Sequence, residues 1–356
     1  MMKNSLRIWW VFLLVALFIS LLASCGKKGT KSGNGADFIA FLSSRSGDCY
    51  LHTMSSDGSD QRKLEEARSC YGTYGRHPLL SPSRTRIAFA QENRIQSYPI
   101  QSWAMIVNAD GSGMDTLVID TQLHSFVFLG DWSPDGSKLV YHLSSTDTSK
   151  MGVYVINPDG SGKLRLDQGI DPRFCGNDKV VYAQLGGRGI YVIGTNGQDK
   201  RRLQEAPSGV LEKPAGSSDG KRVAFCRGLV VPPPNQRCWL EIIESDSSGQ
   251  IQLAEIPNVY MIDDIEFSPD NKRILVLAVG EMSAEIYVVN TDGSDFRPLT
   301  DNSAVPGGAR WSPDGSRIVF TSTKDGNQEI YTVNTSGIPL PRRLTYHLAY
   351  DNRPDW

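Results

Sequence analysis

The segment Gly216-Ser217-Ser218-Asp219-Gly220 has the G-x-S-x-G spacing of the nucleophile elbow in serine hydrolases. In that elbow a strand precedes the serine and a helix follows it, and Asp and His partners complete the site. Here the alternating apolar run 222–226 follows at once, which predicts a strand. The segment also aligns with Trp311-Ser312-Pro313-Asp314-Gly315, where proline occupies the place of Ser218. We therefore interpret it as a structural turn, and we predict no catalytic residues.

Acidic turns and histidines are the residues that could hold a metal ion. The turn 290–295 (NTDGSD) is rich in oxygen ligands, but it has neither the distal glutamate nor the flanking helices of an EF-hand loop. The histidines lack the close spacing of zinc ligands; they are His52, His77, His124, His142 and His347. We predict no metal and no cofactor, although a ring-shaped fold could still bring distant side chains together.

The N-terminus has the pattern of an exported, lipid-anchored protein. Lys3 and Arg7 precede an apolar run from residue 8 to 22, and Leu22-Ala23-Ser24-Cys25 follows. This order resembles the bacterial lipobox, which implies that residues 1–24 are a signal peptide and that Cys25 carries the lipid. The residue after it, Gly26, resembles an outer-membrane sorting signal, which implies a protein that faces the periplasm if the cell is Gram-negative.

Residues 25–36 are rich in glycine and lysine, so they cannot bury enough apolar surface to fold and are expected to form a flexible tether. The remaining chain, 37–356, contains no segment with the composition of a linker between domains. The formal net charge of −2, with both signs interspersed, argues against nucleic-acid binding.

Five of the six cysteines remain after Cys25 is assigned to lipid. Disulfides persist in the compartments that exported proteins reach. Cys226 and Cys238 flank the loop of one predicted hairpin and form a possible disulfide, whereas Cys49 and Cys70 are a weaker candidate pair. We expect Cys175 to be a small buried apolar residue.

An internal repeat determines the predicted fold. Each copy has a short strand ending in Trp or Phe, a Ser-Pro-Asp-Gly turn, two alternating strands joined by a loop, an Asp-Gly turn and a fourth short strand. The clearest copy begins at Ala309, others begin at Arg76, Gly130, Asp171, Pro214 and Asp264, and a truncated copy runs from Phe38 to Leu64. Four antiparallel strands recurring every 40–50 residues or so favour a β-propeller.

We predict seven blades, because seven second strands can be counted. These begin near Phe38, Arg86, Lys138, Lys179, Arg222, Arg273 and Arg317. The truncated first copy lacks its opening strand, and the tail 351–356 matches that missing strand, with Trp356 in the position of Trp132 and Trp311. The C-terminal strand should therefore complete blade 1 and close the ring. We expect the repeated aromatic residues to pack between blades.

The pattern WSPDG, then IYVxN, then DGS, then RLT resembles the TolB-type, WD-repeat-like propeller family over nearly all of residues 37–356. The resemblance implies an all-β propeller. In TolB itself a separate α/β domain precedes six blades, whereas here the tether leads directly into the first of seven. We therefore interpret the chain as a TolB-repeat protein other than TolB.

Loop composition suggests where a partner would bind. The loops between second and third strands are long and irregular, and they should share one face of the propeller. Apolar residues in and beside these loops are the candidate contacts: Trp103, Val230, Val231, Trp239 and Tyr260.

The leading hypothesis is a monomeric scaffold that binds envelope proteins. An enzyme such as a polysaccharide lyase or a metal-dependent lactonase would need clustered charged side chains at the inner ends of the first strands. We expect those positions to be mostly Ser, Ala, Leu or Gly, apart from Arg76, Arg173 and Arg310. A module that binds a sugar or peptide is a third possibility.

Overall fold

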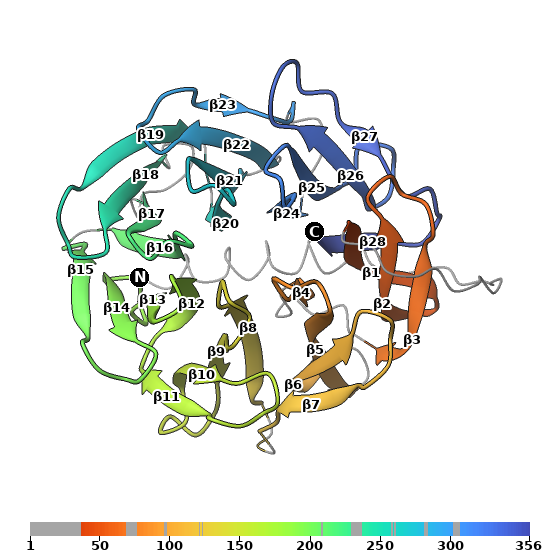
Figure 1. The fold of residues 1–356 in the computed structure, drawn as a ribbon, viewed down its shortest axis with the longest axis horizontal. Helices are drawn as coiled ribbons and strands as arrows, with labels where there is room; N and C mark the ends of the chain where they lie inside the picture. Colours follow the sequence, from red (N-terminus) through yellow and green to blue (C-terminus); the bar gives the residue numbers. More distant parts are fainter. Residues whose placement is uncertain are drawn as a thin grey trace, which may run out of the picture.

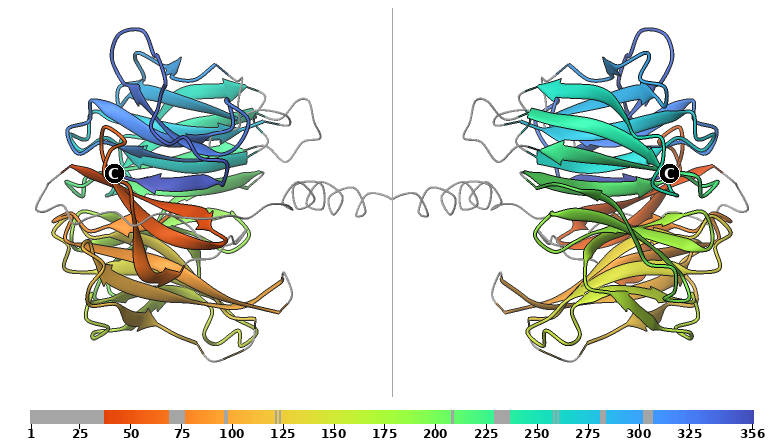
Figure 2. Two further views of the ribbon diagram at one scale, coloured as in Figure 1. Left: turned by 90° about the vertical axis from the view of Figure 1, so that its right-hand side faces the viewer. Right: turned by 90° about the vertical axis from the view of Figure 1, so that its left-hand side faces the viewer.

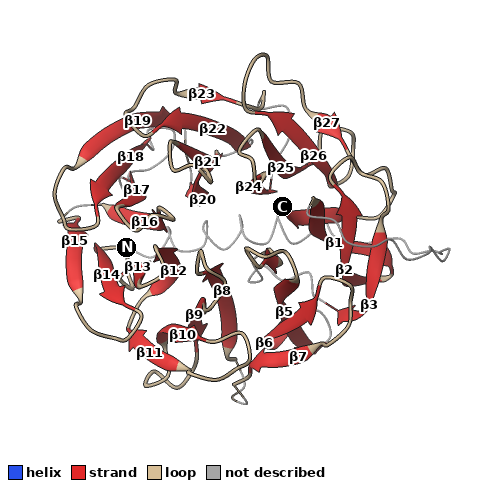
Figure 3. Cartoon of the chain, viewed as in Figure 1, coloured by secondary structure: helices blue, strands red, loops and turns tan. Residues whose placement is uncertain are grey.

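The computed structural model describes residues 37–68, 77–95, 98–120, 122, 124–207, 209–228, 237–257, 259, 261–280, 284–301 and 307–356. Within these residues the chain forms seven antiparallel sheets of four strands each. The sheets are arranged as blades around a central axis (Figure 1). The predicted seven-bladed propeller is confirmed, and the described residues are strands, turns and loops throughout (Figure 3).

Each blade is ordered from its innermost strand, next to the axis, to its outermost strand. Blade 1 contains β28 (Asp351–Asp355), β1 (Phe38–Ser46), β2 (Asp48–Ser55) and β3 (Arg62–Arg68). Blade 2 contains β4 (Leu79–Leu80), β5 (Arg86–Ile95), β6 (Tyr98–Asn108) and β7 (Asp115–Val118). Blade 3 contains β8 (Phe126–Trp132), β9 (Leu139–Ser144), β10 (Gly152–Ile156) and β11 (Leu164–Asp167). Blade 4 contains β12 (Ile170–Cys175), β13 (Lys179–Ala183), β14 (Gly189–Gly194) and β15 (Arg201–Glu205).

The last three blades follow the same order. Blade 5 contains β16 (Val210–Gly216), β17 (Arg222–Gly228), β18 (Arg237–Glu244) and β19 (Ile251–Pro257). Blade 6 contains β20 (Met261–Phe267), β21 (Arg273–Val279), β22 (Ala284–Asn290) and β23 (Arg297–Pro298). Blade 7 contains β24 (Gly307–Trp311), β25 (Arg317–Ser322), β26 (Glu329–Asn334) and β27 (Arg342–Arg343). Every second strand begins within one residue of its predicted start.

The Ser-Pro-Asp-Gly turn has a defined physical role. In blade 7 the Ser312 hydroxyl donates to Oδ1 of Asp314 at 2.6 Å and accepts the backbone N–H of Arg317 at 2.9 Å. Gly315 has φ = 70°, the left-handed region that favours glycine. The turn thus uses each of its polar side chains locally and sets the start of the next strand.

The G-x-S-x-G segment is the same turn, as predicted. Ser217 donates to Asp219 at 2.6 Å and accepts the N–H of Arg222 at 2.9 Å. Ser218, at the position of a catalytic serine, donates its hydroxyl hydrogen to Oδ1 of Asn271 in the next blade at 3.2 Å. No helix follows, since β17 begins two residues after the turn.

The Asp-Gly-Ser turns likewise use their acidic residues for local hydrogen bonds. Oδ1 of Asp292 accepts the backbone N–H of Ser294 at 2.9 Å and its hydroxyl at 2.6 Å. These hydrogen bonds lower the pKa of Asp292. The same pair of bonds joins Asp110 to Ser112 and Asp159 to Ser161. The local hydrogen bonds account for the acidic residue in these turns.

Aromatic residues join neighbouring blades, as expected. The indole N–H of Trp132 in blade 3 donates to the carbonyl of Leu79 in blade 2 at 3.0 Å. Trp311 in blade 7 donates in the same way to the carbonyl of Glu266 in blade 6 at 3.3 Å, and the guanidinium of Arg273 lies over its ring. The apolar core therefore lies between successive sheets.

The C-terminal strand closes the ring. In blade 1, β28 pairs with β1 through Ala40–Asp355, Leu42–Asn352 and Ser43–Asp351. The Trp356 indole N–H donates to the Asp37 carboxylate at 2.6 Å. The predicted closure of blade 1 by the tail is confirmed.

The two faces of the propeller differ in the length of their loops. The long hairpin of β5 and β6 projects beyond the body of the molecule, and β17 and β18 meet on the same side (Figure 2). The Ser-Pro-Asp-Gly turns lie at the opposite ends of the second strands. In the described part of the chain, no helix is long and apolar enough to span a membrane.

Candidate functional site

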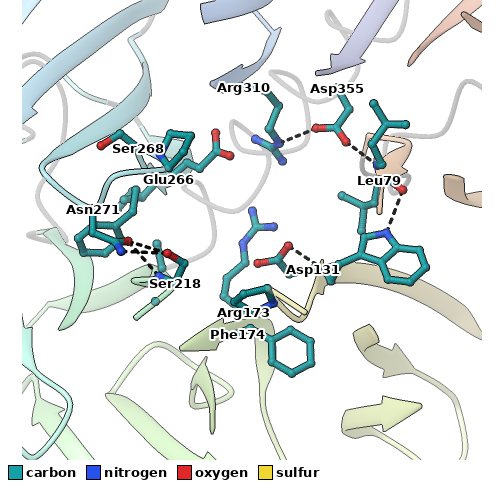
Figure 4. A pocket seen from close by; sticks show the side chains of 18 of the residues that line it. Leu79, Asp131, Arg173, Phe174, Ser218, Glu266, Ser268, Asn271, Arg310 and Asp355 are labelled. Atoms are coloured by element: carbon teal, nitrogen blue, oxygen red, sulfur yellow. Dashed lines mark hydrogen bonds and ion pairs between the residues drawn. The ribbon is translucent and has the colours of Figure 1, made fainter. Parts of the chain in front are cut away.

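The candidate site is a cavity of about 260 Å³ at the mouth of the central channel (Figure 4). Turn residues Pro134, Ser218 and Pro269 form part of its lining, so the cavity opens on the face of the Ser-Pro-Asp-Gly turns. In an inner strand, the residue before the terminal aromatic points the opposite way from it and therefore faces the channel. In five blades that residue is charged: Asp131, Arg173, Glu266, Arg310 and Asp355.

A buried group of three ion-paired side chains connects blades 4, 6 and 7. Asp264 accepts from Arg173 Nη2 at 2.5 Å through one oxygen and from Arg310 Nη1 at 2.6 Å through the other. All three side chains are more than nine-tenths buried as residues. Arg173 also donates to the carbonyl of Gly130 in blade 3. Two cations around one carboxylate offset part of the cost of burying the charges.

Three further carboxyl groups line the cavity, and each accepts one backbone N–H. Asp131 accepts from Trp132 at 2.8 Å, Glu266 from Trp311 at 3.3 Å and Asp355 from Leu80 at 2.6 Å. Burial, which disfavours the ionised form, raises the pKa of all three. The pKa of Glu266 rises to about 8 and that of Asp355 to about 6.

The polar groups of this site are incompletely used within the described structure. Nη2 of Arg310 is buried and has no hydrogen-bond acceptor among the described residues. Asp355 lies 3.6 Å from Nε of Arg310, but no described cation lies within ion-pair distance of Asp131 or Glu266. Because unsatisfied buried polar groups cost free energy, these groups make the cavity a candidate binding site.

The expectation for the inner strand ends was partly wrong. Arg173 and Arg310 lie there as expected, but Asp131, Glu266 and Asp355 do too, and Asp264 lies beneath them. The overlooked signal is the residue directly before each repeated Trp or Phe. Arg76 lies outside the described residues.

Two of the predicted partner contacts, Trp103 and Trp239, do not line the cavity. Trp103 and Trp239 are half-buried, not exposed, and Trp103 packs against the apolar core between blades 1 and 2. Val230, Val231 and Tyr260 lie outside the described residues, as does Cys25. The role of these residues stays a prediction.

Cys226 and Cys238 lie on the adjacent strands β17 and β18, both buried. The structure has them as thiols; burial, and then a hydrogen bond with Cys238, raises the pKa of Cys226. The disulfide between them remains a prediction. Cys175 is fully buried, as expected, and burial raises its pKa to about 12. Cys49 is a buried thiol, and its suggested partner Cys70 lies outside the described residues.

The histidines are distributed around the molecule. His52, His77 and His142 are buried, whereas His124 is exposed. Burial holds the pKa of His77, which begins the inner segment of blade 2, well below its usual value, so this ring is neutral. Within the described residues, no group of three or more His, Cys, Asp or Glu side chains is arranged to hold a metal ion.

Comparisons with known proteins agree with this architecture. Residues 192–356 match the family model PD40, the TolB beta propeller domain. No curated protein matches the sequence. Residues 192–356 are therefore similar to the TolB beta propeller domain.

Three solved structures illustrate the likeness of fold. An oligogalacturonate lyase in complex with manganese has a TM-score of 0.63 at 14% identity, covering 84% of this chain and 86% of that one. TolB from Acinetobacter baumannii has a TM-score of 0.52 at 13% identity, covering 90% and 82%. The β-propeller domain of the trilobed protease from Pyrococcus furiosus has a TM-score of 0.58 at 12% identity, covering 85% and 88%. At these identities the likeness is one of fold.

Proposed function

We propose that this chain is a lipid-anchored envelope protein whose propeller binds a partner protein at the mouth of its channel. The N-terminal pattern that ends at Cys25 supports the export and the anchor. The TolB-like repeats support a place in the envelope, facing the periplasm in a Gram-negative cell. The protein acts as a monomeric scaffold with no cofactor.

The unsatisfied guanidinium of Arg310 carries the proposal for the binding site. Arg310 lines the cavity, and its buried Nη2 group has no acceptor among the described residues. Glu266, which also lines the cavity, has no ion-pair partner among the described residues. A free protein gains nothing from such groups, whereas a bound ligand satisfies both at once. We infer that the charged residues that line the cavity serve to bind a ligand.

Binding is favoured over catalysis by how the arginines are used. Arg173 and Arg310 each donate a hydrogen bond to Asp264, and these bonds fix both guanidinium groups in place. Fixed charges without a mobile nucleophile or base suit recognition. The turn that contains Ser218 is structural, since its polar groups serve the turn and the next blade.

Site-specific photo-crosslinking in the native envelope tests this proposal. A photoreactive amino acid at Ser218 lies in the cavity wall, whereas one at Ser248 lies in an exposed turn of the same blade away from the cavity. We expect one or two envelope proteins to be captured at Ser218 and none at Ser248. Capture at Trp103 but not at Ser218 would indicate that the binding site lies on the opposite face of the propeller. Failure at all three positions would argue against a protein partner and for a small ligand such as a sugar.

Catalysis in the same cavity is the second candidate. Glu266, with a pKa of about 8, is protonated at neutral pH and could act as a general acid. A propeller of similar fold is an oligogalacturonate lyase. Release of unsaturated products from oligogalacturonate, abolished in Glu266→Gln, would establish this activity; no product from the wild type would count against it.

A further inference from the structure

The charge balance of the cavity indicates what it binds. Two guanidinium groups, of Arg173 and Arg310, face the carboxyl groups of Asp131, Glu266 and Asp355, and both guanidinium groups already share Asp264 beneath them. The buried imidazole of His77 is neutral. Carboxyl groups are therefore in excess over cations within the cavity.

Two more cations act on this region from outside the cavity. Arg84 lies over the ring of Phe38, donates to the carbonyl of that residue and attracts Asp355 electrostatically. The positive charge of Arg353 contributes to the lowered pKa of His77. Neither side chain lines the cavity. Asp131 and Glu266 are thus the carboxyl groups of the cavity that have no ion-pair partner among the described residues.

We propose that the mouth of the channel binds a primary ammonium group that has an oxygen acceptor on the adjacent carbon, as the amino end of a polypeptide does. The ammonium donates to carboxyl oxygens of Asp131 and Glu266, and Glu266 releases its proton to solvent as the ammonium binds. Nη2 of Arg310 donates to the neighbouring oxygen. This inference rests on the proposed function and names the part of the partner that enters the cavity.

The carboxyl groups select a cation over an anion. An anion would have to approach Asp131, Glu266 and Asp355 to reach the two arginines, whose positive charge Asp264 partly cancels. Repulsion by the ionised carboxylates among them opposes the approach of an anion. The described side chains also form no group suited to a metal ion, so a molecular cation with directional N–H donors fits better.

Arg310 supplies the second half of the recognition. Its Nη1 and Nε atoms are engaged by Asp264 and Asp355, which leaves Nη2 as the unused donor. The side chain is only 5% exposed, so the fork cannot turn to seek water without breaking both ion pairs. An acceptor on the ligand satisfies Nη2 where it stands. An ammonium without a neighbouring oxygen would leave this donor unused.

The walls suit the end of a chain. Trp132, Phe174 and Phe267 line the cavity together with the Ser-Pro-Asp-Gly turns, which form its rim. The volume of about 260 Å³ is enough for one or two small residues.

Calorimetric titration of the full chain in detergent tests the proposal with triglycine amide as the probe. We expect saturable binding, at least about tenfold weaker with the N-acetylated peptide, which lacks the ammonium. Ethanolamine has an ammonium and an adjacent hydroxyl: weaker binding than the peptide identifies a chain end, whereas equal binding identifies a small amine as the source. Methylamine, without the oxygen, should bind more weakly than either.

Matched variants locate the binding. Glu266→Gln should lower the affinity for the peptide at least about tenfold, whereas Glu212→Gln should leave the affinity unchanged. Glu212 also lies on an inner strand and burial raises its pKa, but it does not line the cavity. Equal affinity for the free and acetylated peptides, or no effect of Glu266→Gln, overturns the inference. Partner capture at Ser218 together with no peptide binding would overturn this inference alone and leave the proposed function standing.

Discussion

Replacing Glu266 with glutamine removes an ionisable group from the cavity and keeps the size of the side chain. Burial raises the pKa of Glu266 from its ordinary 4.5 to about 8. Between those two pH values the folded chain holds a proton that the unfolded chain has released. Protonated Glu266 therefore makes its full contribution to the stability of the fold below pH 4.5, and this contribution is lost as the pH rises toward 8.

The expected magnitude follows from that interval. One such group lowers the free energy of unfolding by about 1.4 kcal/mol for each pH unit, or roughly 5 kcal/mol across the whole range. Asp355 contributes in the same direction up to its pKa of about 6. Above pH 6 the slope should come mainly from Glu266. Glutamine cannot ionise, so this slope should disappear in the variant.

Guanidinium chloride unfolding of the full chain at pH 5, 6, 7 and 8 measures the effect. We expect Glu266→Gln to approach the wild type at pH 5 and to exceed it by several kcal/mol at pH 8. Glu205→Gln is the matched control, because that side chain is exposed on the outer strand of blade 4 and should leave the pH dependence unchanged. Parallel curves for Glu266→Gln and the wild type would show that Glu266 ionises normally, which would refute the argument from burial.

Three further predictions concern the framework of the ring. Asp264→Asn leaves two buried guanidinium groups without their shared carboxylate and should cost about 3–5 kcal/mol in denaturant unfolding, whereas Asn at the neighbouring half-buried Asp263 should cost less than about 1 kcal/mol. Trp356→Ala removes a buried side chain at the point of closure and should cost about 3–5 kcal/mol; a normal melting temperature would show that the tail is dispensable. If Cys226 and Cys238 join after export, the intact mass should be lower by two hydrogen atoms and thiol labelling should spare both; full labelling after unfolding without reductant would exclude the bridge.

The architecture was predictable because the repeat encodes it locally. The Ser-Pro-Asp-Gly turn at 312–315 closes on itself through Ser312 and Asp314, and it fixes the start of β25 without help from distant residues. The tail could be placed because Trp356 has the position of Trp311 in the pattern. Local turn chemistry and one aromatic position therefore suffice to count the blades.

The candidate site was not predictable in the same way, because it departs from the repeat. The residue before the aromatic is aspartate in blade 3 and arginine in blades 4 and 7, whereas in blade 5 it is alanine and Gly216 replaces the aromatic, so no periodic signal marks it. Asp264 meets Arg173 across 91 positions of sequence and Arg310 across 46. Only the closed ring brings these side chains together, so their combined charge in one cavity cannot be read from any single repeat.

The pairing of β28 with β1 has a consequence for how the chain folds. Blades 2 to 7 each form from neighbouring hairpins, so they can assemble in sequence as the chain becomes available. Blade 1 instead joins Ala40 to Asp355, the most distant contact in the ladder, and Asp355 also contributes to the cavity. If the chain is exported as proposed, β1 keeps an open edge until β28 has crossed the membrane. Closure of the ring and completion of the cavity are then one event. A chain cut short before Asp351 should therefore lose binding at the proposed site and also expose an aggregation-prone edge.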